Sequence, residues 1–183
     1  MKEFFSFLFE VLKIVVIAVA IVIPIRYFLF QPFIVKGESM LPNFENGDYL
    51  LIDEISFRFR PPQRGEVIVF RPPNQSSVRY IKRIIGLPGE TIQIKDGDVM
   101  IAQGDDHFQL LDESDYLPRS TFTAGSLRLT LKEGEYFVLG DNRQFSSDSR
   151  IFGPVPRENI IGRVFFRAFP FTTFRKIEVP AYY

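Results

Sequence analysis

Two side chains that could act as a nucleophile and as a base stand far apart in the sequence, a serine in a short turn and a lysine in an apolar run. The serine is Ser39, within GESMLP at residues 37–42. Glycine admits backbone angles that other residues avoid, and proline fixes φ at about −65°, so this turn has few conformations available. A serine displayed on such a turn can act as a nucleophile, although the hexapeptide alone also fits an ordinary exposed turn.

The lysine is Lys82, within SVRYIKRII at residues 77–85, which reads as a strand. Side-chain alternation places Tyr80 and Ile84 on the same face as Lys82. Apolar neighbours desolvate the ammonium group and lower its pKa from about 10.4 toward neutrality. A lysine with such a pKa can act as a general base. The alternative is that its long side chain reaches past these neighbours to solvent.

A third candidate segment is the polar stretch GDNRQFSSDSR at residues 140–150, which follows the apolar run 136–139. Functional loops are common at the ends of strands. Its two aspartates and two arginines could hold the loop together through ion pairs, such as Asp148 with Arg150. In isolation the stretch also fits a solvated surface loop.

Composition excludes several other chemistries. The chain has no cysteine, which excludes disulfides, thiol catalysis and cysteine-ligated metals. It has one histidine, His107, in a polar stretch that reads as a loop, so a base for Ser39 is expected elsewhere. The 22 basic and 22 acidic residues balance, and nothing indicates a nucleic-acid-binding surface.

The N-terminal region must position whatever follows it. Residues 11–30 carry only two charges, Lys13 and Arg26, and residues 14–25 have no polar side chain. Twenty helical residues span roughly 30 Å, about one hydrocarbon core, so we predict one transmembrane helix. A cleavable signal peptide is the alternative, because residues 18–20 spell Ala-Val-Ala, but this site lies in the middle of the apolar run.

Residues 31–183 are predicted to form a mostly β domain of short strands separated by glycine and proline. The expected strands are residues 48–55, 66–70, 78–85, 90–95, 127–131, 136–139 and 160–166. No helical period of useful length follows the N-terminal run. Residues 103–125 are more polar and less periodic, which indicates a variable insertion or long hairpin.

Three of these segments, taken in order, resemble the signature blocks of type I signal peptidases. They are GESMLP at residues 37–42, YIKRIIGLPGE at 80–90 and GDNRQFSSDSR at 140–150, with RGEVIVF at 64–70 resembling the strand between the first two. The upstream apolar run and the chain length fit the same layout. The resemblance implies an antiparallel β catalytic domain behind one transmembrane helix, and a serine protease that removes signal peptides by a Ser-Lys dyad.

Carried over by position, the resemblance makes Ser39 the nucleophile and Lys82 the general base, with Ser146 orienting the lysine. The residues expected to brace the site are Asp141, Arg143, Asp148 and Arg150. The backbone N–H of Ser39 would supply the oxyanion hole. Some family members add a serine hydroxyl two positions before the nucleophile, where this chain has Gly37, so the second oxyanion donor is unassigned. The residues expected to line the substrate pocket are Met40, Tyr80 and Ile81.

The resemblance further implies partners and an orientation. The substrates would be secretory preproteins with Ala-x-Ala-type cleavage sites, and the lipid bilayer would be the second partner. Residues 1–30 would form the cytoplasmic N-terminus and single anchor in a bacterial plasma membrane, and residues 31–183 the extracytoplasmic domain. No cofactor or metal is implied. Two alternatives stay open, a self-cleaving Ser-Lys protein and a non-catalytic membrane-anchored β module that binds envelope proteins.

Overall fold

The computed structural model describes residues 2–28, 30–73, 75, 77–104, 107–180 and 182. Eight residues of the predicted anchor and β domain lie outside these ranges: Met1, Leu29, Asn74, Ser76, Asp105, Asp106, Ala181 and Tyr183.

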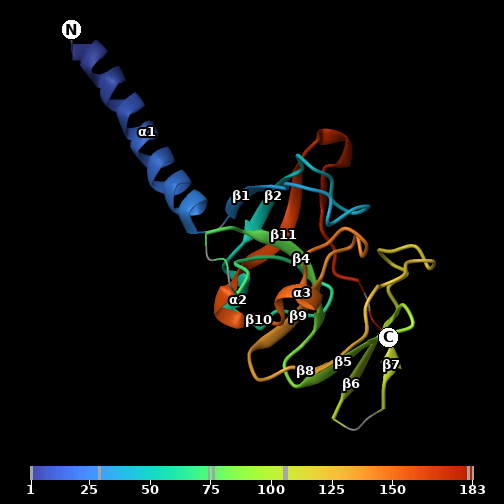
Figure 1. Ribbon diagram of the computed structural model, residues 1–183. Coiled ribbons are helices and arrows are strands. Elements are labelled where there is room, and N and C mark those ends of the chain that lie inside the picture. The colour runs from blue at the N-terminus through green and yellow to red at the C-terminus, as the bar shows by residue number, and fades with distance from the viewer. Residues whose placement is uncertain are drawn as a thin grey trace.

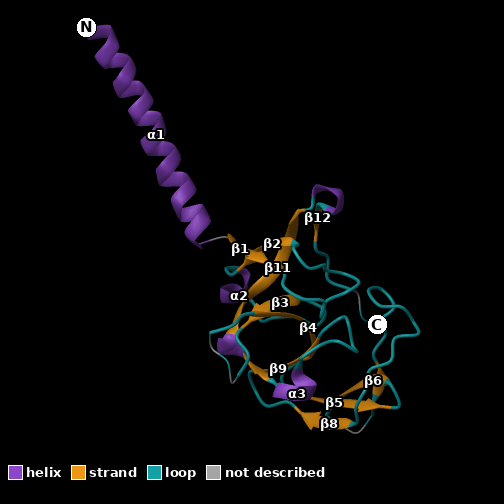
Figure 2. Ribbon diagram, turned by 45° about the horizontal axis from the view of Figure 1, so that its top comes forward, coloured by secondary structure: helices purple, strands orange, loops and turns teal. Residues whose placement is uncertain are grey.

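The N-terminal helix stands apart from the rest of the molecule. Helix α1 (Lys2–Phe28) extends away from the β strands in Figure 1 and Figure 2. Exposed apolar side chains such as Phe4, Leu8 and Ile14 cover its described surface. Within the described part of the chain, no helix has both the length and the hydropathy needed to cross a bilayer. The transmembrane span predicted over residues 11–30 is therefore not confirmed, although most of it is helical.

The remainder is mostly β, as predicted, and is built from two antiparallel sheets. The larger has the order β1-β2-β11-β3-β4-β9-β10, with β12 also paired to β11, and the smaller has the order β7-β6-β5-β8. Strands of the larger sheet are β1 (Phe30–Ile34), β2 (Tyr49–Asp53), β3 (Val67–Phe70), β4 (Tyr80–Gly86), β9 (Glu135–Leu139), β10 (Val155–Pro156), β11 (Ile160–Phe169) and β12 (Arg175–Lys176). Strands of the smaller sheet are β5 (Glu90–Lys95), β6 (Asp98–Gln103), β7 (Gln109–Leu110) and β8 (Leu127–Thr130).

The core consists of three apolar clusters, and strand β4 contributes to each of them. Ile81 lies in the cluster around Met40 and Phe44, Ile84 in the cluster around Phe70, and Ile85 in the cluster beneath the smaller sheet. β4 is hydrogen-bonded to β3 on one side and to β9 on the other. A strand enclosed in this way buries its polar side chains together with its apolar ones.

Every predicted strand overlaps a strand of the structure, but several elements were not predicted. Strand β6 was not predicted, although the Asp-Gly pair at residues 96–97 is a sequence signal for a hairpin. In the structure Asp96 and Gly97 have φ of 54° and 93° and join β5 to β6 in a tight turn. β1 contains Pro32, which an edge strand tolerates. The single-turn helices α2 (Ser56–Phe59) and α3 (Ser149–Phe152), and the 3₁₀ turns η1 (Arg157–Asn159) and η2 (Phe171–Thr173), are too short for a periodic signal.

The segment at residues 103–125, predicted as a variable insertion or hairpin, is a hairpin only at its start. β7 pairs with β6, and the residues after Leu110 run as loops and turns. Tyr116, Leu117 and Thr123 of this segment are buried. The segment therefore belongs to the packed structure of the domain.

Candidate active site

The turn that carries Ser39 connects β1 to β2 and is held from both sides. Met40 and Phe44 are each 1% exposed and pack into the core, while Ser39 itself is half-buried. The Phe44 N–H donates to the Met40 carbonyl at 2.9 Å. Gly37 has φ of +88°, and its N–H donates to Asn46 Oδ1 at 3.0 Å. The two buried side chains fix the turn so that Ser39 faces outward from the core.

Lys82 reaches this turn from the buried strand β4. Its Nζ donates to Ser39 Oγ at 2.7 Å and to the Ile81 carbonyl at 2.8 Å. Lys82 as a whole is 4% exposed. Burial lowers the pKa of Lys82 to about 8, against the opposing fields of Asp148 and Asp141. The predicted burial of Lys82 beside Tyr80 is confirmed, since Nζ lies 5.5 Å from the Tyr80 ring centre. The lysine does not reach past its neighbours to solvent.

The loop after β9 packs directly against the serine turn. The Asn142 N–H donates to the Ser39 carbonyl at 3.0 Å. A Cβ at Gly140 would stand 2.5 Å from the Ser39 carbonyl oxygen and 2.2 Å from Ser146 Oγ, which real contacts do not allow. Only glycine permits this close approach of the two backbones.

Asp148 organises the second half of the same loop. It is fully buried, caps α3 and accepts from the Gly140 N–H at 3.1 Å. Arg150 donates to both carboxylate oxygens at 2.8 Å. The ion pair between Asp148 and Arg150 expected from the sequence is therefore present, and the loop is not a freely solvated one.

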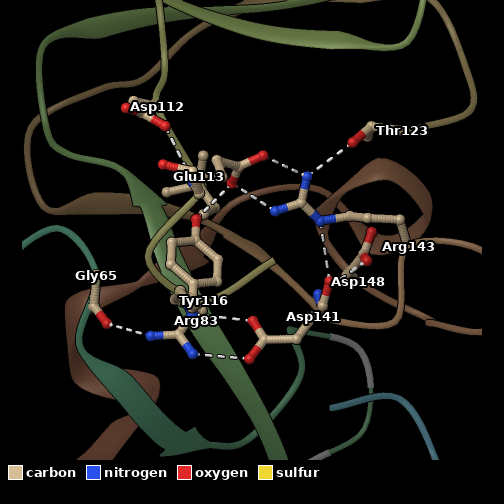
Figure 3. Close-up of polar contacts among 12 residues, drawn as sticks. Gly65, Arg83, Asp112, Glu113, Tyr116, Thr123, Asp141, Arg143 and Asp148 are labelled. Atoms are coloured by element: carbon tan, nitrogen blue, oxygen red, sulfur yellow. Dashed lines mark hydrogen bonds and ion pairs between the residues drawn. The ribbon is translucent and has the colours of Figure 1, made fainter. Parts of the chain in front are cut away.

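A buried network of ion pairs lies behind the loop (Figure 3). Arg83, next to Lys82 on β4, donates to both oxygens of Asp141 at 2.9 and 2.7 Å. Arg143 donates to Glu113 at 2.7 and 2.5 Å and to Thr123 Oγ1 at 2.7 Å. Both arginines are 3% exposed, so each buried charge has a partner.

Tyr116 joins the two halves of this network (Figure 3). Its hydroxyl donates to Glu113 Oε1 at 2.5 Å, and its ring stacks on the Arg83 guanidinium at 4.0 Å. Its carbonyl accepts from Asn43 Nδ2 at 2.8 Å, and the same amide donates to Asp141 at 2.9 Å. Asn43 lies in the turn that carries Ser39, so the network reaches all three segments that carry the candidate site.

A cleft of about 470 Å³ opens beside Ser39 and Lys82. Tyr80 and Ile81 line it, as the sequence predicted, together with Phe33, Ile34 and Val78. Met40 does not line it, because its side chain points into the core and anchors the turn. The expectation of a pocket-lining Met40 is corrected accordingly.

Ser146 lies against this site but does not bond to it as expected. Its Oγ is buried and has no hydrogen-bond partner among the described residues. The predicted bond to Lys82 is thus not formed, and the orienting role of Ser146 stays a prediction. His107 is exposed and does not line the cleft. The described residues contain no group of three His, Cys, Asp or Glu side chains able to hold a metal.

Sequence reasoning assigned no role to five residues of the site: Asn43, Arg83, Glu113, Tyr116 and Asn142. Arg83 had a usable signal, since it follows Lys82 in an apolar strand and a buried arginine needs a carboxylate. Glu113 and Tyr116 had none, because they lie in the polar segment that reads as an insertion.

A serine hydroxyl in contact with a buried amine is an arrangement in which the serine can act as a nucleophile and the amine as a base. Residues 8–169 match the family model described as signal peptidase, peptidase S26. A probable signal peptidase I-1 from Synechocystis is 36% identical over 172 residues, which cover 90% of this chain and 84% of the relative. Signal peptidase I from Bacillus licheniformis is 36% identical over 179 residues, which cover 93% of this chain and 94% of that relative. A crystal structure of signal peptidase I from Enterococcus faecalis is 33% identical, with a TM-score of 0.47, covering 57% of this chain and 97% of that one.

The chain is therefore a hydrolase of the serine endopeptidase class. It belongs to the signal peptidase family, peptidase S26.

Proposed function

We propose that this protein removes N-terminal signal peptides from exported preproteins, with Ser39 as nucleophile and Lys82 as general base. The observation that carries the proposal is the 2.7 Å contact between Lys82 Nζ and Ser39 Oγ. It joins a serine to an amine whose pKa of about 8 leaves part of it neutral near physiological pH.

The proposed reaction proceeds through an acyl-enzyme. Neutral Lys82 accepts the Ser39 hydroxyl proton while Oγ attacks the scissile carbonyl carbon. The Ser39 N–H donates to the oxyanion of the tetrahedral intermediate. The C–N bond then breaks, and Lys82 passes its proton to the leaving amine. Water hydrolyses the ester in the same manner, releasing the signal peptide and restoring Ser39.

The cleft supports binding of an extended peptide. Its walls include Ile34 at the end of β1 and Lys36 just after it, and Val78 and Arg79 before β4. Backbone segments at strand ends can pair with an added strand, and alternate side chains of that strand then enter one pocket. We assign the Ala-x-Ala residues of secretory preproteins to this cleft, with Tyr80 and Ile81 against their small side chains.

Membrane attachment belongs to the same proposal. The support is the sequence of residues 11–30, whose only charges are Lys13 and Arg26, together with family membership. Residues 1–30 would place the N-terminus in the cytoplasm and tether the β domain outside a bacterial plasma membrane, facing emerging preproteins.

The deciding experiment compares the full chain with its Ser39→Ala and Lys82→Ala variants on a preprotein bearing an Ala-x-Ala site. We expect cleavage by the parent and a loss of at least about 10³-fold in kcat for each variant. Ser120→Ala and Lys95→Ala, at exposed positions away from the cleft, are the matched controls and should retain activity. Equal processing by all variants would exclude the dyad. Cleavage of the enzyme's own chain alone would favour the self-cleaving alternative. No cleavage of any substrate would favour the non-catalytic binding module.

A further inference from the structure

Asn142 makes two hydrogen bonds to the backbone around Ser39. Its N–H donates to the Ser39 carbonyl at 3.0 Å, and its side-chain Nδ2 donates to the Glu38 carbonyl at 3.1 Å. The two carbonyls belong to the peptide units on either side of the Ser39 Cα. One residue of the loop after β9 therefore holds both peptide planes that meet at the candidate nucleophile.

The identity of the donating atom follows from chemistry. An asparagine amide has one oxygen and one nitrogen at its end, and turning it by half a rotation exchanges them. The oxygen facing the Glu38 carbonyl would bring two acceptors together without a proton between them. The nitrogen is therefore the atom that faces Glu38.

The bond to Glu38 acts on the N–H that the proposed mechanism uses. The carbonyl of Glu38 and the N–H of Ser39 belong to one planar peptide unit, which is trans, so they point in opposite directions. Holding the carbonyl against Asn142 fixes the N–H on the opposite side. Among the described residues no acceptor takes this N–H, which leaves it free to donate to a substrate.

Asn142 is itself held in place on both sides. Its neighbour Asp141 is bonded to Arg83 and Asn43, and its neighbour Arg143 is bonded to Glu113. An asparagine fixed between two buried ion pairs presents its amide in one place. This rigidity is what a residue needs if it is to orient a neighbouring dipole.

The need for such a residue is greater because Gly37 has no hydroxyl. A serine there would be the second oxyanion donor in the layout that the sequence resembles. Gly37 offers only its N–H, which already donates to Asn46. When one donor remains, its direction determines more of the transition-state stabilisation.

We propose that Asn142 is a positioning residue that orients the Ser39 N–H as oxyanion donor, through the bond from its side-chain amide to the Glu38 carbonyl. The proposal rests on the proposed function, since it takes Ser39 as the nucleophile. Asn142 need not touch the substrate, and its effect should appear in the chemical step alone.

The test measures kcat and KM for Asn142→Ala and Asn142→Asp on an Ala-x-Ala peptide substrate. Alanine removes the side-chain bond and keeps the backbone bond, and kcat should fall about tenfold with KM unchanged. Aspartate places a carboxylate oxygen against the Glu38 carbonyl, so its kcat should fall further than that of the alanine variant. Gln144→Ala, exposed on the same loop, is the matched control and should keep the parent kcat.

A second measurement, the affinity for a peptide aldehyde, distinguishes an effect of Asn142 on the direction of the Ser39 N–H from an effect on the stability of the fold. An Ala-x-Ala peptide aldehyde forms a tetrahedral adduct with a serine nucleophile, so its affinity should fall by the same factor as kcat in Asn142→Ala. Unchanged kcat and aldehyde affinity would overturn the proposal. A loss of thermal stability that accounts for the lost activity, with aldehyde affinity of the folded fraction unchanged, would overturn it too. Full activity of Ser39→Ala would instead remove the proposed function itself.

Discussion

Lys82 shows how a buried position can shift the protonation of a side chain at the expense of stability. Desolvation on the enclosed strand β4 disfavours its ammonium form and lowers its pKa to about 8. Asp148 and Asp141 oppose this shift, yet desolvation outweighs their fields. The same amine would be almost fully protonated near neutral pH in the unfolded chain.

The pH dependence of the reaction should report this amine. Below pH 8 Lys82 is mostly protonated and cannot accept the Ser39 proton, so kcat/KM should rise about tenfold per pH unit on the acid side and level off above pH 8. The measurement is kcat/KM for a peptide substrate from pH 5 to 10. A profile without this rise would contradict a lysine base.

Replacing the lysine should stabilise the fold at neutral pH. The unfolded lysine has its ordinary pKa of 10.5, so between pH 8 and 10.5 the unfolded chain binds more protons and folded-state stability rises with pH. Below pH 8 the full penalty of the buried charge applies, up to about 3 kcal/mol. Lys82→Met should therefore raise the free energy of unfolding at pH 7, and the gain should shrink toward pH 10.5. Denaturant unfolding at both pH values checks this, and a destabilised variant at pH 7 would contradict it.

Replacing Ser146, like replacing Lys82, should change activity and stability in opposite directions. Its buried Oγ has no hydrogen-bond partner in the described part of the chain, and an unsatisfied hydroxyl of this kind costs about 1–3 kcal/mol. If the hydroxyl turns to Lys82 during the reaction, Ser146→Ala should lower kcat while leaving the melting temperature equal or higher. Ser120→Ala, exposed, should change neither. Parent kcat in Ser146→Ala would show that the lysine needs no orienting serine.

At the scale of elements, the segment at residues 103–125 contributes more than its sequence indicates. Glu113 bonds to Arg143, and Tyr116 stacks on Arg83 (Figure 3). The Tyr116 carbonyl also accepts from Asn43. These three partners lie in the loop that carries Asn142, in the strand that carries Lys82 and in the turn that carries Ser39. The site is thus supported from a polar loop as well as from the sheet.

Removing the carboxylate of this loop should destabilise the whole domain. Glu113→Ala leaves Arg143, whose side chain is 1% exposed, as a buried charge without its carboxylate, which costs about 3–5 kcal/mol. Thermal and denaturant unfolding should show the loss, and activity should fall with it. Asp115→Ala is the control, because Asp115 is exposed on the same segment and should change stability by less than about 0.5 kcal/mol. Equal stability of both variants would exclude a supporting role for Glu113.

The sequence was informative where a local pattern determines the structure. Strand β5 was predicted with its observed bounds, and Lys82 was placed on the correct strand face, because alternation is a property of neighbouring residues. The contact of Glu113 with Arg143 joins residues 30 positions apart through tertiary packing, which leaves no trace in local periodicity. Met40 was misassigned because adjacency to Ser39 does not say which way a turn residue points.

At the scale of the whole molecule, the helix α1 and the β domain have different surfaces. The domain packs three apolar clusters in its interior and exposes single apolar side chains such as Phe59 and Phe171. Along α1, by contrast, the described apolar side chains, such as Phe9, Leu12 and Ile17, are exposed. An apolar surface of this extent is unusual on a protein surrounded only by water. Within the described residues the helix does not meet the requirements for a bilayer crossing, so attachment must be tested directly.

We expect the full chain to fractionate with membranes and to resist extraction at alkaline pH, because the proposed anchor over residues 11–30 is apolar between its two charges. Val15→Arg combined with Val19→Arg should release the protein into the soluble fraction, since each charge at the centre of a span costs roughly 2.5–3.5 kcal/mol. The released protein should still cleave a short Ala-x-Ala peptide, because Ser39 and Lys82 lie in the β domain. Glu3→Arg with Glu10→Arg, which adds the same number of arginines before residue 11, is the control and should stay with membranes. A parent chain found in the soluble fraction would refute the anchor and leave the proposed peptidase chemistry intact.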